Sequence, residues 1–201
     1  MKEVNFMRKK RETLKDGTKV LIRDLHYEDL DQLMKFYRSL PLEDRVYLKV
    51  DVTKRRVVEQ RMKLIEEGTI FRIIAFHEDE IVGDGMFEIS KEGWRKHQGE
   101  LRVIVARPFQ RRGLGMIMMR ELHSLAMKED VEKIVVKMMK PQKGAINICK
   151  KLGFHKETII PNYVWDQAGE PQDLVIMTCK PQNLWNELEH SYSESDWRRC
   201  R

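Results

Sequence analysis

The segment from Glu100 to Lys128 constrains the fold of this chain more than any other part of its 201 residues. Apolar side chains alternate with other residues from Glu100 to Val105, which is typical of a largely buried strand. Pro108 then ends the strand, because proline has no N–H to donate. A basic turn at residues 110–115 (QRRGLG) follows, and beyond it apolar residues recur at helical spacing. A helix start with unpaired N–H groups, beside glycines and arginines, predicts a cradle for a pyrophosphate.

This turn differs from the commoner nucleotide-binding motifs. No Lys-Ser or Lys-Thr pair follows Gly115, which argues against a P-loop, and the three spaced glycines of a dinucleotide site are missing. A flexible turn between strand and helix is the alternative to a ligand site. The succession of strand, Pro108, Gln110, paired basic residues and two glycines resembles motif A of the GCN5-related N-acetyltransferases (GNAT). In that family, backbone amides of motif A hold the pyrophosphate of acetyl-CoA.

A second segment, residues 145–154 (AINICKKLGF), resembles motif B of the same family, a short helix that ends in Leu-Gly-Phe. Gly153 suits the left-handed position after a helix, and Lys150 and Lys151 suit the negative end of that helix. The β-branched run at residues 133–139 predicts the preceding strand. In the family, this strand and the strand before motif A run parallel and splay apart, and the pantetheine arm of CoA lies between them.

The resemblance implies which residues contact acetyl-CoA, the acyl donor. They lie at the end of the strand, in the glycine turn and on the motif B helix: Ile104, Val105, Ala106, Arg111, Arg112, Gly113, Leu114, Gly115, Met116, Asn147 and Lys150. The resemblance covers residues 17–180 and is most specific at motifs A and B.

The remaining patterns fit the same α/β fold. They predict strands at residues 18–23, 70–76, 80–89, 156–165 and 174–179, and amphipathic helices over residues 27–37 and 57–65. The resemblance implies a GNAT fold, with a mixed, mostly antiparallel central sheet of about six or seven strands flanked by helices. We divide the chain into a basic N-terminal extension (1–16), an N-acetyltransferase domain (17–180) and a polar C-terminal tail (181–201), in which we expect a short helix followed by disorder.

Composition indicates a globular, cytoplasmic protein. Apolar residues make up 41% and charged residues 35% of the chain, no apolar run could span a membrane, and the basic N-terminus lacks the apolar stretch of a signal peptide. Three widely spaced cysteines argue against a disulfide framework, and the histidines show no ligand spacing, so we predict no metal site. The net charge of +6 fits an anionic partner such as CoA. Basic residues alone are weak support for nucleic acid, which we do not expect as a partner.

The N-terminal part narrows the resemblance. Residues 14–23 (LKDGTKVLIR), with Glu28-Asp29 and residues 36–40 (FYRSL), resemble the acetyltransferase domain of Pat-type bacterial protein lysine acetyltransferases. This implies that the favoured acceptor is a lysine side chain on another protein. Three alternatives remain: an acetyltransferase for a small amine (polyamine, amino acid or antibiotic), a catalytically silent acyl-CoA sensor, and a nucleic-acid-associated protein. The acceptor side is expected around residues 40–52 and 162–171, which carry no motif, and homodimer formation stays open.

Glu100 is the candidate catalytic base. It stands on an otherwise apolar strand ahead of motif A, where many family members place a catalytic glutamate. We expect partial burial to raise its pKa toward neutrality, so that it can accept a proton from the acceptor amine directly or through a water. A salt bridge with Arg102 is the competing interpretation. Asp84 and Glu88, on the neighbouring strand, are the reserve candidates.

Cys149 marks a departure from the family pattern. Many relatives have a tyrosine at this position, which protonates the departing CoA thiolate. The sequence favours a small core residue, since Ala145, Cys149 and Leu152 share one helix face and free cysteine is often buried. A thiol acting as the acid, or a cysteine that itself takes the acyl group, are the other hypotheses. Pat-type enzymes act with a glutamate and without this tyrosine, so the resemblance implies that the absence of the tyrosine does not exclude activity.

Overall fold

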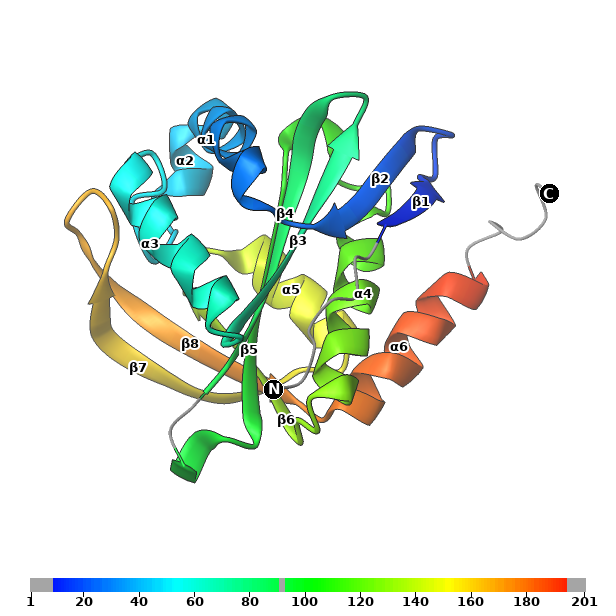
Figure 1. The fold of residues 1–201 in the computed structure, drawn as a ribbon. Helices are drawn as coiled ribbons and strands as arrows, with labels where there is room; N and C mark the ends of the chain where they lie inside the picture. The colour runs from blue at the N-terminus through cyan, green and yellow to red at the C-terminus, as the bar shows by residue number, and fades with distance from the viewer. Residues whose placement is uncertain (1–8, 91–92, 195–201) are drawn as a thin grey trace.

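The computed structural model describes residues 9–90 and 93–194. Within them, eight strands form one sheet in the order β1-β2-β3-β4-β5-β6-β8-β7, with helices on both of its faces (Figure 1). The strands are β1 (Lys9–Thr13), β2 (Lys19–Asp24), β3 (Ile70–His77), β4 (Glu80–Ile89), β5 (Gln98–Val105), β6 (Lys133–Met139), β7 (His155–Trp165) and β8 (Pro171–Cys179). The helices are η1 (Tyr27–Asp29), α1 (Leu30–Ser39), α2 (Leu42–Arg45), α3 (Arg55–Glu66), η2 (Gly93–Arg95), η3 (Arg107–Phe109), α4 (Leu114–Lys128), α5 (Lys143–Lys151) and α6 (Pro181–Glu194).

The predicted mixed α/β sheet is confirmed, and its strand count is corrected. The sheet has eight strands instead of six or seven, because Lys9–Thr13, which we assigned to the N-terminal extension, pairs antiparallel with β2. The sequence of β1, KKRET, has no apolar alternation because this strand lies exposed at the edge of the sheet.

Two apolar cores lie on opposite faces of the sheet. Helices α1 and α3 pack on one face, and α4, α5 and α6 pack on the other (Figure 1). Strand β5 contributes to both, because successive side chains point to opposite faces: Leu101 belongs to the core under α4, whereas Ile104 packs against the core under α1 and α3. The even-numbered side chains of β5, including Glu100, therefore face the side of α1 and α3.

Strands β5 and β6 are the parallel pair of the described sheet, and they separate early. Their ladder contains Gln98↔Lys133, Gly99↔Ile134 and Glu100↔Val135 and ends there. Beyond that point β5 continues to pair with β4 as far as Val105, while β6 continues to pair with β8 as far as Met139. The predicted splay of two central parallel strands is thus confirmed, and it begins at Glu100.

Both segments flanking the predicted domain pack on it as far as they are described. Helix α6 lies along α4, with Leu184 and Leu188 in the core, and its start is fixed by His123, whose Nε2–H donates to the carbonyl of Pro181 at 2.7 Å. The predicted disorder falls on residues 195–201, which lie outside the described residues, and the boundaries at residues 16 and 180 stay a prediction. In the described part of the chain, none of the helices is long and apolar enough to cross a membrane.

Candidate functional site

The motif A turn exposes a row of backbone donors. Arg111 and Gly113 have φ of +60° and +95°, and the first intrahelical bond of α4 runs from the N–H of Ile117 to the carbonyl of Gly113 at 3.1 Å. Among the described residues, no backbone acceptor faces the six N–H groups of residues 111–116. Gly113 suits this place because its left-handed conformation is costly for most side chains. A run of unpaired N–H groups at the start of a 15-residue helix fits a pyrophosphate.

The two arginines of the turn have different environments. Arg112 is held by the turn between β1 and β2: its guanidinium donates to Asp16 at 2.7 Å, and its carbonyl accepts the N–H of Lys15 at 3.0 Å. The Arg111 side chain is exposed and makes no hydrogen bond or ion pair within the described residues. The turn is thus braced through Arg112, and Arg111 supplies the cation that remains available to an anion.

The register of β5 decides which of its backbone groups face the gap toward β6. The N–H of Ala106 bonds to the carbonyl of Val82, and in an antiparallel ladder such bonds recur at alternate residues. The backbone groups of Ile104 and Ala106 therefore point to β4, and those of Val103 and Val105 point into the gap. Gln110 closes the end of the gap, since its Nε2 donates to the carbonyl of Val105 at 2.9 Å.

This geometry refines the predicted donor contacts on β5. The backbone groups of Val105 and Val103 point into the gap, and those of Ile104 and Ala106 point to β4; Val103 is not among the residues expected from the sequence. On α5, which follows β6 in the chain, Asn147 and Lys150 are exposed. The structure thus brings the strand and turn residues together, since a Cβ at Gly115 would lie 3.8 Å from the side chain of Val105, and it leaves Asn147 and Lys150 exposed on α5.

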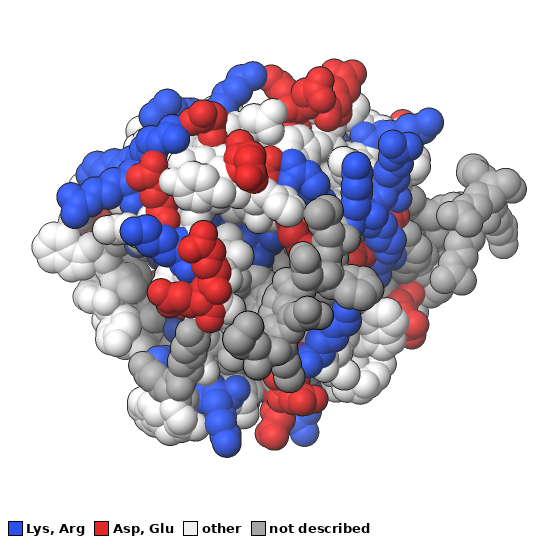
Figure 2. Space-filling view, viewed as in Figure 1, with Lys and Arg blue, Asp and Glu red and all other residues white. Residues whose placement is uncertain are grey.

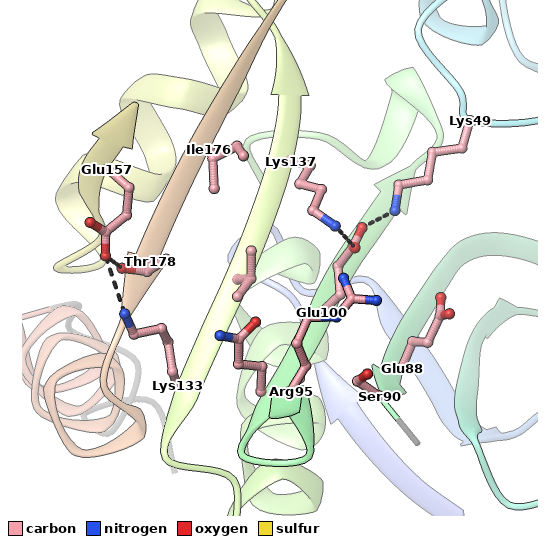
Figure 3. Close-up of a pocket in the computed structure, with 13 residues that line it drawn as sticks. Lys49, Glu88, Ser90, Arg95, Glu100, Lys133, Lys137, Glu157, Ile176 and Thr178 are labelled. Atoms are coloured by element: carbon pink, nitrogen blue, oxygen red, sulfur yellow. Dashed lines mark hydrogen bonds and ion pairs between the residues drawn. The ribbon is translucent and has the colours of Figure 1, made fainter. Parts of the chain in front are cut away.

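Glu100 lies in a cavity of about 540 Å³ at the point where β5 and β6 separate (Figure 3). Its Oε1 accepts from the ammonium of Lys49, and its Oε2 accepts from the ammonium of Lys137 at 3.0 Å (Figure 3). Only 16% of its side chain is exposed. The other residues that line the cavity are Glu88, Ser90, Arg95, Gln98, Gly99, Lys133, Val135, Glu157, Ile176 and Thr178.

The expected electrostatics of Glu100 are corrected by these two lysines. Burial alone would raise its pKa, but the charges and hydrogen bonds of Lys49 and Lys137 outweigh burial and hold the pKa below its ordinary value. The carboxylate pairs with Lys49 and Lys137, whereas we had considered Arg102 as its partner. Glu100 is therefore ionised at neutral pH and binds primary ammonium groups.

The two reserve candidates have different surroundings. Asp84 is 1% exposed and forms a bidentate pair with Arg72, at 2.7 and 2.9 Å, and it accepts a further bond from Tyr37 Oη at 2.8 Å. These contacts occupy both of its oxygens, so Asp84 ties β3, β4 and α1 together and does not reach the cavity. Glu88 lines the cavity and lies directly opposite Glu100 in the β4–β5 ladder, so it remains a reserve base.

Cys149 has the surroundings of a core residue. It is 7% exposed and belongs to the core under α4, as predicted. Burial, with a smaller contribution from Cys179, raises the pKa of its thiol to about 11. A thiol that stays protonated and buried is a poor nucleophile, which argues against acyl-cysteine chemistry.

The two segments expected on the acceptor side are joined to each other. At the tip of the β7–β8 hairpin, the N–H of Gln167 donates to the carbonyl of Val46, and its Nε2 donates to the carbonyl of Leu48, both at 2.9 Å. The hairpin and the segment after α2 thus form a continuous wall beside the cavity. Exposed aromatic side chains occur on the hairpin, at Tyr163 and Trp165, and next to the cavity at Trp94.

Charged side chains of both signs are mixed on the face seen in Figure 2, without one continuous basic stripe. Such mixing gives a groove-binding interaction with nucleic acid no support on this face. In the described part of the chain, no three His, Cys, Asp or Glu side chains are grouped so as to hold a metal ion.

A model of the acetyltransferase (GNAT) family matches residues 30–154, which is more than half of the chain. The chain therefore belongs to the GNAT family. It is an N-acetyltransferase that uses acetyl-CoA as its acetyl donor. A search among curated proteins finds no significant match.

Solved structures share the fold at low sequence identity. The GNAT domain of S. lividans PAT superposes with a TM-score of 0.71 at 14% identity, over 86% of this chain and 96% of that chain. A ribosomal-protein-alanine N-acetyltransferase from Brucella melitensis superposes with a TM-score of 0.67 at 20% identity, over 79% of this chain and 98% of that chain. A phosphinothricin acetyltransferase from Sinorhizobium meliloti, in complex with AcCoA, superposes with a TM-score of 0.69 at 15% identity, over 80% of this chain and 88% of that chain. At these identities the likeness establishes the fold alone.

Proposed function

We propose that this N-acetyltransferase transfers the acetyl group directly from acetyl-CoA to a lysine side chain on another protein, with Glu100 as the base. The observation that carries the proposal is the position of Glu100. Its carboxylate lies in the cavity where β5 and β6 separate and already binds two primary ammonium groups, those of Lys49 and Lys137. An acceptor lysine offers the same group, so the site is chemically matched to it.

The donor side of the proposal uses the gap and the motif A turn. The pyrophosphate is bound by the N–H groups of residues 111–116 and by Arg111, and the pantetheine arm by the backbone of Val103 and Val105. Asn147 and Lys150 contact the donor from α5. This assignment adds Val103, gives Ile104 and Ala106 no role through their N–H groups, and keeps the other contacts expected from the sequence.

The chemistry follows from the arrangement. Glu100 accepts a proton from the acceptor ammonium, directly or through a water, and the neutral amine attacks the thioester carbon. The carbonyl oxygen gains negative charge in the transition state, and the N–H groups of Val103 and Val105 are the donors nearest to the gap that can stabilise it. With Cys149 buried, no side chain on α5 replaces the missing tyrosine, so the thiolate leaves before it is protonated.

The surroundings of the cavity favour a protein as the acceptor. Tyr163, Trp165 and Trp94 are 63%, 72% and 80% exposed, and aromatic side chains of this kind are enriched at protein interfaces. Because the net charge of the chain is +6, we expect the acceptor lysine to be set among acidic residues. Binding of this acceptor should weaken as the salt concentration rises.

The cavity volume also suits a second candidate acceptor, a small amine such as a polyamine, amino acid or antibiotic, since sites for small molecules occupy about 300–1,000 Å³. A free-thiol assay with acetyl-CoA separates the two. We expect turnover with lysine peptides rich in Asp and Glu, little with matched Arg-rich peptides, and loss of both in Glu100→Gln. Turnover with small amines alone would replace the protein acceptor by the small one, and turnover that Glu100→Gln leaves unchanged would remove Glu100 as the base.

A further inference from the structure

Lys49 occupies the place at Glu100 that an acceptor amine must take. Its ammonium contacts Oε1 of Glu100 inside the cavity, and it reaches there from the segment after α2 (Figure 3). This segment forms the acceptor wall, together with the tip of the β7–β8 hairpin. Lys49 is therefore presented to Glu100 from the side on which an external lysine would enter.

The backbone around Lys49 is fixed, so its side chain is directed into the cavity. Leu48 and Val52 are 8% and 3% exposed and belong to the core under α1 and α3. The carbonyl of Leu48 accepts a bond from the side chain of Gln167 at 2.9 Å. The segment at Lys49 forms neither helix nor strand, but these contacts hold its backbone, so the side chain is the part that can adjust.

Lys137, the other partner of Glu100, is placed differently. It belongs to β6, which borders the gap on the donor side, and it is held in the ladder opposite Ile176 of β8. The proposed acceptor comes from the side of Lys49, whereas Lys137 belongs to one of the two strands that border the gap proposed for the pantetheine arm.

We infer that Lys49 is a self-acetylation site, modified by the same chain from acetyl-CoA in the absence of an external acceptor. The inference rests on the proposed function of Glu100. Glu100 takes a proton from the Lys49 ammonium, the neutral Nζ attacks the thioester carbon, the N–C bond forms and the C–S bond breaks. Of the two protons that the ammonium loses, one ends on the CoA thiol and the other in solvent.

Two consequences follow from this step, and the first distinguishes it from adventitious acetylation. Because nucleophile and base belong to one folded chain, the reaction is first order in enzyme and its rate constant does not change on dilution. Acetyl-Lys49 is neutral, so Glu100 keeps the ammonium of Lys137 as its remaining lysine partner.

The test is to incubate the purified protein with acetyl-CoA alone and to map acetylated lysines by mass spectrometry over time. Lys54 is the internal control, since it lies in the same segment and its side chain is 71% exposed, against 39% for Lys49. Uncatalysed acetylation should favour the more exposed Lys54. We expect Lys49 to react more than about tenfold faster than Lys54, with a loss of about 10²-fold or more in Glu100→Gln, the range for removal of a general base.

Two variants and a dilution series complete the test. Lys49→Arg keeps a cation at Glu100 but removes the acceptor amine. In this variant, none of the remaining lysines should be acetylated faster than Lys54. Acetylation that appears on Lys137 in place of Lys49, that is equal at Lys49 and Lys54, that persists in Glu100→Gln, or whose rate constant falls on dilution would overturn the inference. Turnover with an external acceptor is measured in parallel: turnover without acetyl-Lys49 refutes self-acetylation alone, whereas loss of both refutes the proposed function as well.

Discussion

Replacing Asp84 by asparagine should destabilise the fold strongly while leaving the chemistry intact. Asp84 and Arg72 are 1% and 4% exposed, and the substitution keeps the shape of the side chain but removes the charge that compensates Arg72. The charge-assisted bonds at 2.7 and 2.9 Å would be weakened or lost, and the guanidinium would stay buried. Breaking one partner of a buried ion pair costs about 3–5 kcal/mol.

For a chain of this length, 1 kcal/mol shifts Tm by about 2–4 °C, so Asp84→Asn should melt about 6–20 °C below the wild type. Tyr37→Phe is the matched control, since it removes a single bond of 2.8 Å to the same carboxylate and should cost about 1.5–3 kcal/mol. Melting is followed by circular dichroism and turnover by free-thiol release, both below the melting range. A variant that melts with the wild type but loses activity about 10²-fold or more would refute the reasoning and make Asp84 the base.

Three further predictions concern single side chains. Glu100→Gln should lower turnover at neutral pH by about 10²–10⁴ with little change in acetyl-CoA affinity, measured by steady-state kinetics and titration calorimetry. The folded pKa of Glu100 lies below the ordinary value of 4.5, so its ion pairs stabilise the fold above that pH and stop doing so as pH falls through the folded pKa. The difference in Tm between wild type and Glu100→Gln should therefore narrow over this pH range. A difference that stays constant with pH would contradict the ion pairs. Cys149→Ala should keep most activity, and Cys149 should react slowly with iodoacetamide at neutral pH, because its thiol has a pKa of about 11; rapid labelling blocked by acetyl-CoA would overturn its core role.

Elements whose patterns are local could be predicted from the sequence. Residues 80–89 and 133–139 alternate or run apolar over a full strand, and the structure gives β4 and β6 the predicted bounds. The exposed N–H groups after Gln110 were likewise predictable, because the glycine turn and the helix start carry them, whereas the splay of β5 and β6 was expected only from the resemblance to the GNAT family. Strand β1 was not, since an exposed edge strand with the sequence KKRET buries almost no apolar surface.

Features that depend on distant residues were missed. The direction of the Glu100 pKa shift is set by Lys49 and Lys137, which are 51 and 37 residues away in the chain and meet the carboxylate only in the folded sheet. The role proposed for Val103 depends on which backbone groups β4 occupies, and this register cannot be read from β5 alone. The conformation of the motif A turn could therefore be predicted from a local motif, whereas the surroundings of Glu100 and the register of β5 depend on neighbouring strands.

The central claim, that the motif A turn holds the pyrophosphate of acetyl-CoA, is tested most directly by melting curves with and without the donor. At a hundredfold excess over its dissociation constant, acetyl-CoA should stabilise the wild type by about 2.7 kcal/mol, which corresponds to about 5–11 °C in Tm. Gly113→Asp and Gly113→Asn form a matched pair, because both side chains disfavour the left-handed conformation at φ +95° less than most others do, and they differ in charge. We predict a reduced shift for Gly113→Asn and none for Gly113→Asp. A wild-type melting curve unmoved by millimolar acetyl-CoA, or equal shifts in wild type and Gly113→Asp, would contradict the account.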